Sequence, residues 1–110
     1  MPTSRKKYQV RVSDQAQRML TGHILFLARI NKKAAAKKKR QLMTAIRSLA
    51  AMPFRFPLFQ ETDEICLPLN KYRKMFVENW YLVLYCVEDD TVSVEYILDC
   101  RQEEYQWLLE

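Results

Sequence analysis

The spacing of hydrophobic residues changes from three and four residues over most of the first half of this chain to two residues after about position 70. The first spacing is typical of amphipathic helices and the second of half-buried strands. Because the two kinds of segment are separate rather than alternating, we expect an α+β fold. The length of 110 residues suits one domain, residues 1–110, and a hydrophobic content of 49% is enough to build a core.

The first half of the chain predicts one strand and two helices. Residues 6–12 alternate weakly, which predicts a strand. Ser13 is a suitable N-cap and Asp14 lies where the helix dipole favours an acid, so a helix begins here. Its hydrophobic stripe consists of Ala16, Met19, Leu20, His23, Leu27 and Ile30. Asn31 is expected to end this helix, and a second helix over 34–51 follows so closely that the two form an antiparallel hairpin.

The second half predicts strands over 72–77, 80–87 and 92–98, after a loop of mixed hydrophobic and acidic character over 52–65. The middle strand is hydrophobic on both faces, which indicates a central position in a sheet. We expect an antiparallel meander that completes a four-stranded antiparallel sheet with the N-terminal strand, and a helix hairpin that covers one face. A short C-terminal helix is expected over 101–109.

Positive and negative charges are unevenly divided along the sequence. Residues 1–60 contain 14 Lys and Arg and one acid, whereas residues 61–110 contain four Lys and Arg and 12 acids. The densest run, residues 32–40, is either a solvated helix face or a surface for a polyanion, because clustered cations release counterions from phosphates. The candidate nucleic-acid-binding residues are Lys37, Lys38, Lys39, Arg40 and Lys71. No aromatic residues are interleaved in the run, so base stacking is not expected there.

Several classes of site are excluded by composition. A single glycine excludes glycine-rich phosphate loops, and a single histidine excludes HExxH zinc sites and disfavours a histidine-centred triad. Three cysteines without a CxxC pair fit a reducing compartment. We expect no cofactor and no metal. No signal peptide or membrane-spanning run is visible, so a cytoplasmic protein without a membrane contact is expected.

One group of side chains has the character of a phosphate site. Arg73, Lys74 and Arg101, with nearby aromatic residues, could hold phosphates and stack bases, and cations can stabilise the charged transition state of phosphodiester cleavage without a histidine. The alternative is that Arg73 pairs with Glu78 or Glu95 across the sheet. His23 lies on a hydrophobic stripe, where a structural histidine is more common than a general base.

The second half also contains strings that closely resemble the RelE/ParE family of toxins. These strings are Tyr-Arg-Lys-Met at 72–75, Trp-Tyr-Leu-Val-Leu-Tyr at 80–85, Glu-Asp-Asp-Thr-Val at 88–92 and Ile-Leu-Asp-Cys-Arg-Gln at 97–102. The resemblance extends in order over nearly the whole chain. It implies the toxin of a type II toxin–antitoxin pair, which a cognate antitoxin protein holds inactive.

Within this family the resemblance implies different targets. RelE-type members are ribosome-dependent mRNA endonucleases, whereas ParE-type members share the fold and poison DNA gyrase. The nucleases typically carry an arginine where this chain has Leu82, and two basic residues where it has Arg73 and Met75. Arg101 matches the basic residue after the last strand, and Tyr105 lies close to the C-terminal tyrosine of the family.

The retained cations favour ribosome-dependent mRNA cleavage over gyrase poisoning by a small margin. In that case the catalytic residues implied by the resemblance are Arg73, Lys74, Arg101 and Tyr105, and the partners are the ribosome and mRNA. The alternative is a ParE-like poison of DNA gyrase that acts by protein–protein binding without catalysis. A third class, a basic RNA- or DNA-binding module without toxicity, is also open.

Overall fold

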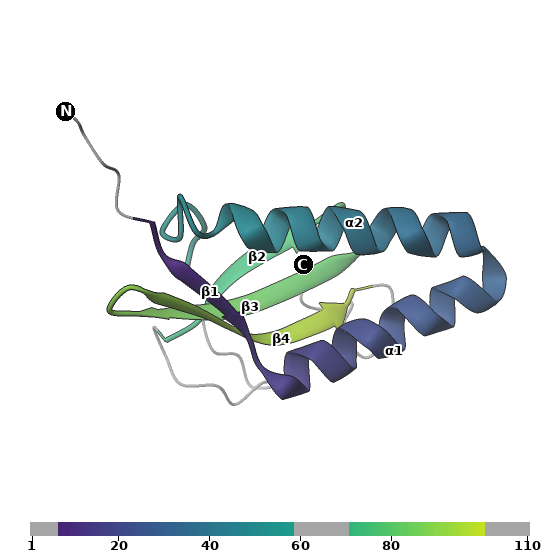
Figure 1. The fold of residues 1–110 in the computed structure, drawn as a ribbon, viewed down its shortest axis with the longest axis horizontal. Coiled ribbons are helices and arrows are strands. Elements are labelled where there is room, and N and C mark those ends of the chain that lie inside the picture. Colours follow the sequence, from purple (N-terminus) through teal and green to yellow (C-terminus); the bar gives the residue numbers. More distant parts are fainter. Residues whose placement is uncertain (1–6, 59–70, 101–110) are drawn as a thin grey trace.

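Two helices follow the first strand and precede the other three in the computed structural model, which describes residues 7–58 and 71–100 (Figure 1). The elements are β1 (Gln9–Val12), α1 (Asp14–Ile30), α2 (Lys32–Ser48), β2 (Arg73–Val77), β3 (Tyr81–Glu88) and β4 (Thr91–Asp99). The α+β class is confirmed, whereas the expected C-terminal helix lies outside the described residues. None of the described helices has the length and hydrophobicity needed to cross a membrane.

Single polar residues set the ends of both helices. The Ser13 Oγ accepts a hydrogen bond from the Ala16 N–H at 3.0 Å and begins α1. Asn31 serves both helices, because its backbone N–H donates to the Leu27 carbonyl while its Oδ1 accepts from the Ala34 N–H. One residue therefore separates the helices, and α2 begins and ends slightly earlier than the predicted range of 34–51.

The sheet has the order β1-β4-β3-β2 and is mixed, so the prediction of an all-antiparallel sheet is wrong. β2, β3 and β4 form the expected antiparallel meander, but β1 runs parallel to β4. The reason is the path of the helix hairpin, which returns the chain to the end where β1 began. There the Tyr8 N–H donates to the Ala50 carbonyl at 2.8 Å. β2 therefore starts in the same direction as β1, and two further reversals give β4 that direction too.

The main core lies between the helix hairpin and one face of the sheet. Its buried side chains include Leu42, Ile46 and Leu49 from the α2 region and Met75, Tyr81, Val83, Tyr85, Val94 and Ile97 from the strands. Ile30, which the predicted stripe places in the core, is 73% exposed. Figure 1 shows the reason, because the tip of the hairpin projects past the sheet.

The opposite face of the sheet is also apolar and buried. Its cluster contains Tyr72, Leu82, Leu84, Cys86, Leu98 and Cys100. β3 contributes to both clusters, as expected for a central strand that is hydrophobic on both faces. Successive residues of a strand point to opposite faces, so neighbours in the sequence belong to different surfaces of this molecule.

Candidate functional site

Arg73 holds the segment that follows α2, residues 52–58, against the sheet. Its Nη1 donates a hydrogen bond to the Phe56 carbonyl at 2.7 Å, and its guanidinium lies 5.0 Å from the centroid of the Phe54 ring. The backbone continues the contact, because the Lys74 N–H donates to the Pro57 carbonyl at 3.0 Å. The alternative of an ion pair with Glu78 or Glu95 is not what the described residues show, since the arginine binds a backbone carbonyl instead.

A buried tyrosine fixes the other end of the same segment. The Tyr85 hydroxyl donates to the Pro53 carbonyl at 2.7 Å in a buried contact. Burial raises the pKa of Tyr85 above its ordinary value, although the Arg73 charge opposes the rise. The hydroxyl is therefore protonated at neutral pH and remains a hydrogen-bond donor. Arg73 and Tyr85 face each other in the register of β2 and β3 and hold the segment together.

The 52–58 segment exposes apolar and cationic side chains to solvent. Phe54 is 56% exposed and Met52 is 49% exposed, and Arg55 between the two phenylalanines is also exposed. Phe54 packs edge-to-face on Tyr8, with 5.9 Å between the ring centroids. Exposed aromatic, methionine and arginine side chains on a fixed backbone are the composition of protein-binding hot spots. This surface was not among the sites predicted from the sequence, although Phe-Arg-Phe between two prolines, at 54–56, is a visible signal.

The predicted catalytic residues do not lie on one surface. Arg73 and Lys74 are consecutive in β2 and point to opposite faces of the sheet. Arg73 faces the helix side with Tyr85, and Lys74 faces the other side with Leu84. They cannot converge on one phosphate in this geometry. Arg101 and Tyr105 lie outside the described residues, so the catalytic role of the four residues stays a prediction.

The two positions at which the chain departs from the nuclease pattern are filled by core side chains. Met75 is 1% exposed and packs in the cluster beneath the helices, whereas Leu82 is 0% exposed and packs on the opposite face. A cation at either position would lose its hydration without a partner in the described core. Met75 and Leu82 therefore belong to the hydrophobic core.

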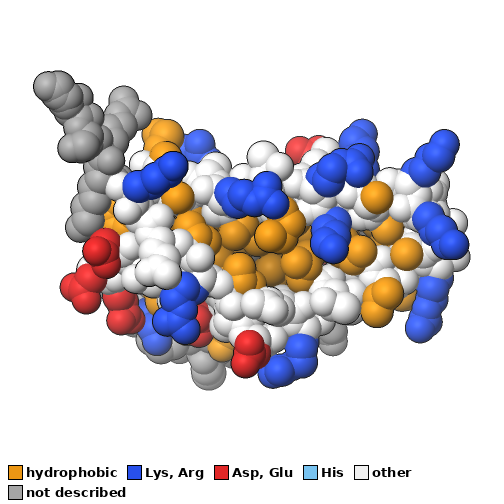
Figure 2. Space-filling view, viewed as in Figure 1, with side chains coloured by type: hydrophobic (Ala, Val, Ile, Leu, Met, Phe, Trp, Pro, Cys, Tyr) orange, Lys and Arg blue, Asp and Glu red, His pale blue; other side chains and the backbone are white. Residues whose placement is uncertain are grey.

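The cations of the basic run at 32–40 do not all have the same surroundings. Lys37, Lys39 and Arg40 are exposed on α2, whereas the Lys38 Nζ lies 4.2 Å from the ring of Trp80. Figure 2 shows Lys and Arg side chains along α2 and at the tip of the helix hairpin, and acidic side chains gathered at the opposite end. This distribution makes the helix side of the molecule positively charged.

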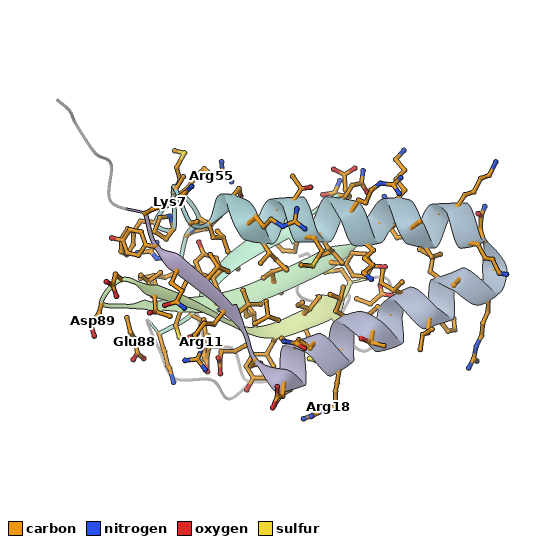
Figure 3. The ribbon with its side chains drawn as sticks, viewed as in Figure 1. Lys7, Arg11, Arg18, Arg55, Glu88 and Asp89 are labelled. Atoms are coloured by element: carbon orange, nitrogen blue, oxygen red, sulfur yellow. The ribbon has the colours of Figure 1, made fainter. Side chains whose placement is uncertain are left out.

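Lys71 does not belong to this surface. Its Nζ lies 5.3 Å from the ring of Tyr72, a residue of the cluster on the face opposite the helices. Electrostatic interaction with Tyr72 raises the pKa of Lys71, so the side chain is charged at neutral pH. Figure 3 shows Arg55 at one end of the molecule with Lys7, and Glu88 and Asp89 at the tip of the β3–β4 hairpin.

The other candidate reactive groups have structural contacts. The His23 Nε2 lies 2.7 Å from the Ile97 carbonyl, and its ring lies 5.7 Å from that of Tyr81, which confirms a structural histidine that joins α1 to the sheet. Cys86 and Cys100 are free and buried, and burial raises the pKa of Cys100 to about 11, so its thiol is not nucleophilic at neutral pH. Over 7–58 and 71–100, no three metal-ligating side chains are grouped.

Comparison with known proteins identifies a family and a fold. A family model described as "ParE toxin of type II toxin-antitoxin system, parDE" matches residues 10–104. Among solved structures, a chain of the "Chromosomal ParDE TA system from P. aeruginosa" matches with a TM-score of 0.67 and 12% sequence identity, over 86% of this chain and 97% of that chain. At this identity the structural match shows the fold alone. A search among curated proteins finds no matching sequence.

Proposed function

The chain belongs to the ParE family of toxins from type II toxin–antitoxin systems, and on that premise we propose that it arrests growth by binding DNA gyrase without catalysis. The cognate antitoxin protein holds it inactive, and both act in the cytoplasm, where gyrase works on DNA. Gyrase poisoning is preferred to ribosome-dependent mRNA cleavage because the matching family is ParE rather than RelE.

The engagement of Arg73 is the observation that best supports binding over catalysis. A guanidinium that stabilises a phosphoryl transition state must point its donors at the phosphate oxygens. Here Arg73 donates to the Phe56 carbonyl and lies against Phe54, where it fixes a segment whose exposed side chains suit a protein partner. We therefore assign Arg73 to the construction of a binding surface.

The exposed cations of α2 suit a second contact, with the DNA that gyrase holds. Gyrase holds DNA while it acts, and a toxin bound to that complex lies close to phosphates. We propose that Lys37, Lys39 and Arg40 contact this DNA, because all three cations are exposed on the same helix. Replacing Lys37, Lys38 and Lys39 together by glutamine should then weaken the binding of gyrase–DNA. Because two of the three proposed contacts are removed, the magnitude of the slope of log affinity against log salt should fall by about 2.

An assay of purified toxin on gyrase tests the proposal directly. We expect the toxin to inhibit supercoiling of plasmid DNA by gyrase and to accumulate cleaved DNA, and to leave mRNA intact on translating ribosomes by primer extension. Discrete mRNA cuts that depend on translation, with gyrase unaffected, would replace the proposal by the cleavage mechanism. Cuts of that kind would also return attention to Lys74, Arg101 and Tyr105.

A matched pair of phenylalanines locates the gyrase contact. Phe54 in the 52–58 segment is 56% exposed and Phe26 on α1 is 57% exposed, so truncation to alanine removes a similar exposed surface from each. We expect Phe54→Ala to raise the toxin concentration for half-inhibition at least about tenfold, as loss of a hot-spot residue does. Phe26→Ala should change it less than about twofold. Equal effects would show that the 52–58 segment is not the gyrase contact.

A further inference from the structure

Helix α1 has an apolar face that no described part of the chain covers. Leu25 and Phe26 lie there in the second half of the helix, and 59% and 57% of their surfaces are exposed. Gly22, one turn earlier, leaves the same side open, because a Cβ at this position would meet nothing within 4 Å. Figure 3 shows Arg18, another turn earlier, pointing away from the rest of the protein. The face is therefore accessible to a partner along several turns.

A shallow hollow with a volume of about 460 Å³ runs along this face. It is lined by two rows of residues spaced four apart, namely Asp14, Arg18 and Gly22 in one row and Gln17, Thr21 and Leu25 in the other. Rows of this spacing are the ridges by which helices pack, and the space between two rows receives the side chains of a second helix. Because Gly22 has no side chain, a second helix can approach the α1 backbone most closely at that residue.

The order of side chains along this face is complementary to itself when it is reversed. Asp14 lies eight residues before Gly22, and Arg29 lies seven residues after it. Arg18 and Phe26 lie four residues to either side of the glycine. A second α1 that runs antiparallel and crosses at Gly22 therefore brings its Arg29 to Asp14 and its Phe26 to Arg18. Twofold symmetry repeats each of these contacts, as in an isologous interface.

Charge favours a second copy on α1 rather than on α2. The exposed charged residues of α2 are all cations, namely Lys32, Lys33, Lys37, Lys39, Arg40 and Arg47. Since the chain has a net charge of +5, two copies repel each other across such a surface. From Asp14 to Phe26, by contrast, the exposed charges of α1 are one acid and one arginine, and they cancel. A second copy can therefore approach this face without net repulsion.

We propose that two copies of this chain form a symmetric dimer through antiparallel packing of α1 on α1, with Gly22 of each copy at the crossing point. The Arg18 guanidinium of each copy lies over the Phe26 ring of the other, as a cation–π contact. Asp14 of each copy pairs with Arg29 of the other. The glycines let the helix axes approach to about 8 Å, the lower end of the usual range. The dimer also removes an exposed apolar patch from water.

The dimer is weak and leaves the 52–58 segment open. One helix from each copy makes a small interface, below about 1,200 Å² in total, so we expect a dissociation constant of about 10–100 µM. Figure 3 shows Arg18 and Arg55 on opposite sides of the molecule, so the surface assigned to gyrase stays exposed in both copies. The inference does not rest on the proposed function, and either can fail without the other.

Sedimentation velocity of the purified full chain, from about 1 to about 500 µM, tests the dimer. We expect the mass to rise from that of one chain to that of two across this range. Phe26→Ala should weaken the dimer at least about tenfold, whereas Phe54→Ala should change it less than about twofold, although the two phenylalanines are almost equally exposed. A monomer at the highest concentration, or equal effects of the two substitutions, would overturn the proposal.

Gly22→Gln tests the crossing point. A side chain here separates the two helices, so the dimer should weaken at least about tenfold. The monomer should keep its fold, because glutamine is a better helix former than glycine and the space around Gly22 is open. Circular dichroism at about 1 µM, below the expected dissociation constant, checks the fold. An unchanged dissociation constant would refute packing at Gly22.

Two charge reversals test the antiparallel register. Asp14→Lys and Arg29→Asp each place like charges together at both ion-pair contacts, and each should weaken its own dimer at least about fivefold. A mixture of the two variants has opposite charges at both contacts, so a mixed dimer should form at least about fivefold more tightly than either variant's own. A fluorescent label on one variant follows this in sedimentation at about 50 mM NaCl, where screening is moderate. No recovery in the mixture would overturn the proposed register.

Discussion

Replacing Arg73 with alanine should release the 52–58 segment from the sheet. The substitution removes a hydrogen bond of 2.7 Å from a charged group to the Phe56 carbonyl, an interaction of about 1.5–3 kcal/mol. It also removes the contact of the guanidinium with the half-exposed ring of Phe54, which contributes about 0.5–1 kcal/mol. Because the two contacts share one side chain and are not additive, we expect the free energy of unfolding to fall by about 2–3 kcal/mol. Domains of this size commonly have a free energy of unfolding of about 5–15 kcal/mol, so the variant should remain folded.

Urea denaturation followed by circular dichroism measures this effect. The midpoint should fall while the dependence on urea stays the same, since the change in exposed surface on unfolding is unaltered. Arg55→Ala is the control, because Arg55 is exposed, donates to the Ser48 Oγ at 3.3 Å and lies over the Phe56 ring, yet does not join the segment to the sheet. Arg55→Ala should lower the free energy of unfolding by less than about 1 kcal/mol. Arg73→Lys should recover part of the loss through its remaining charge.

The result that would refute the reasoning combines two measurements. If Arg73→Ala loses less than about 0.5 kcal/mol and yet abolishes growth arrest, the guanidinium is not needed to hold the segment and acts on the target instead. In that case the catalytic role predicted from the sequence would be preferred. If stability and gyrase inhibition fall together, and Arg73→Lys restores both in part, the structural role of Arg73 is supported.

Three further substitutions have outcomes that the structure determines. Gly22→Ala should raise the free energy of unfolding by about 1 kcal/mol and the midpoint of thermal denaturation by about 4 °C. The reason is that alanine is the better helix former and the added Cβ meets nothing within 4 Å. A lower midpoint would show that the added methyl group is not accommodated. Tyr85→Phe should lower the free energy of unfolding by about 1–3 kcal/mol in urea, because it leaves the Pro53 carbonyl buried without its donor; an unchanged midpoint would mean that water replaces the hydroxyl. Stability should fall as pH rises from about 9 to about 11, because the Cys100 thiol, whose pKa burial raises from 9.0 to about 11, ionises more readily in the unfolded chain. Cys100→Ala should flatten this fall by up to about 3 kcal/mol in urea titrations at several pH values, and an equally steep fall in the variant would assign it to other groups.

Local patterns in the sequence predicted most elements of this fold because their causes are local. Ser13 is the predicted N-cap of α1, and the structure shows its contact with the Ala16 N–H. Asn31 ends α1 as predicted, and the structure adds that its side chain also caps α2. The strands follow from alternation, and β3 is central because it is hydrophobic on both faces. These properties depend on residues within one or two turns of each other, which is the range that a sequence pattern displays.

The candidate site was harder to predict because its contacts join distant parts of the chain. Arg73 and Phe56 are 17 residues apart, and Tyr85 and Pro53 are 32 apart. The exposed surface that they support belongs to a segment whose Phe-Arg-Phe string, between two prolines, is visible in the sequence, but whose fixed position on the sheet is not. A sequence pattern does not show which carbonyl an arginine will meet, so Arg73 was open to both a catalytic and a structural interpretation.

The sequence by itself determined the α+β class, the helix hairpin, the central strand and the resemblance to a toxin family. Only the tertiary structure decided that β1 is parallel to β4, because that depends on where the hairpin returns the chain. It also decided which surface each of Arg73 and Lys74 lies on. That the two point to opposite faces follows from the alternation of a strand, but which face carries the 52–58 segment depends on the packing of α2 against the sheet. Local free-energy preferences specify the elements, and the burial of their shared apolar faces specifies how they meet.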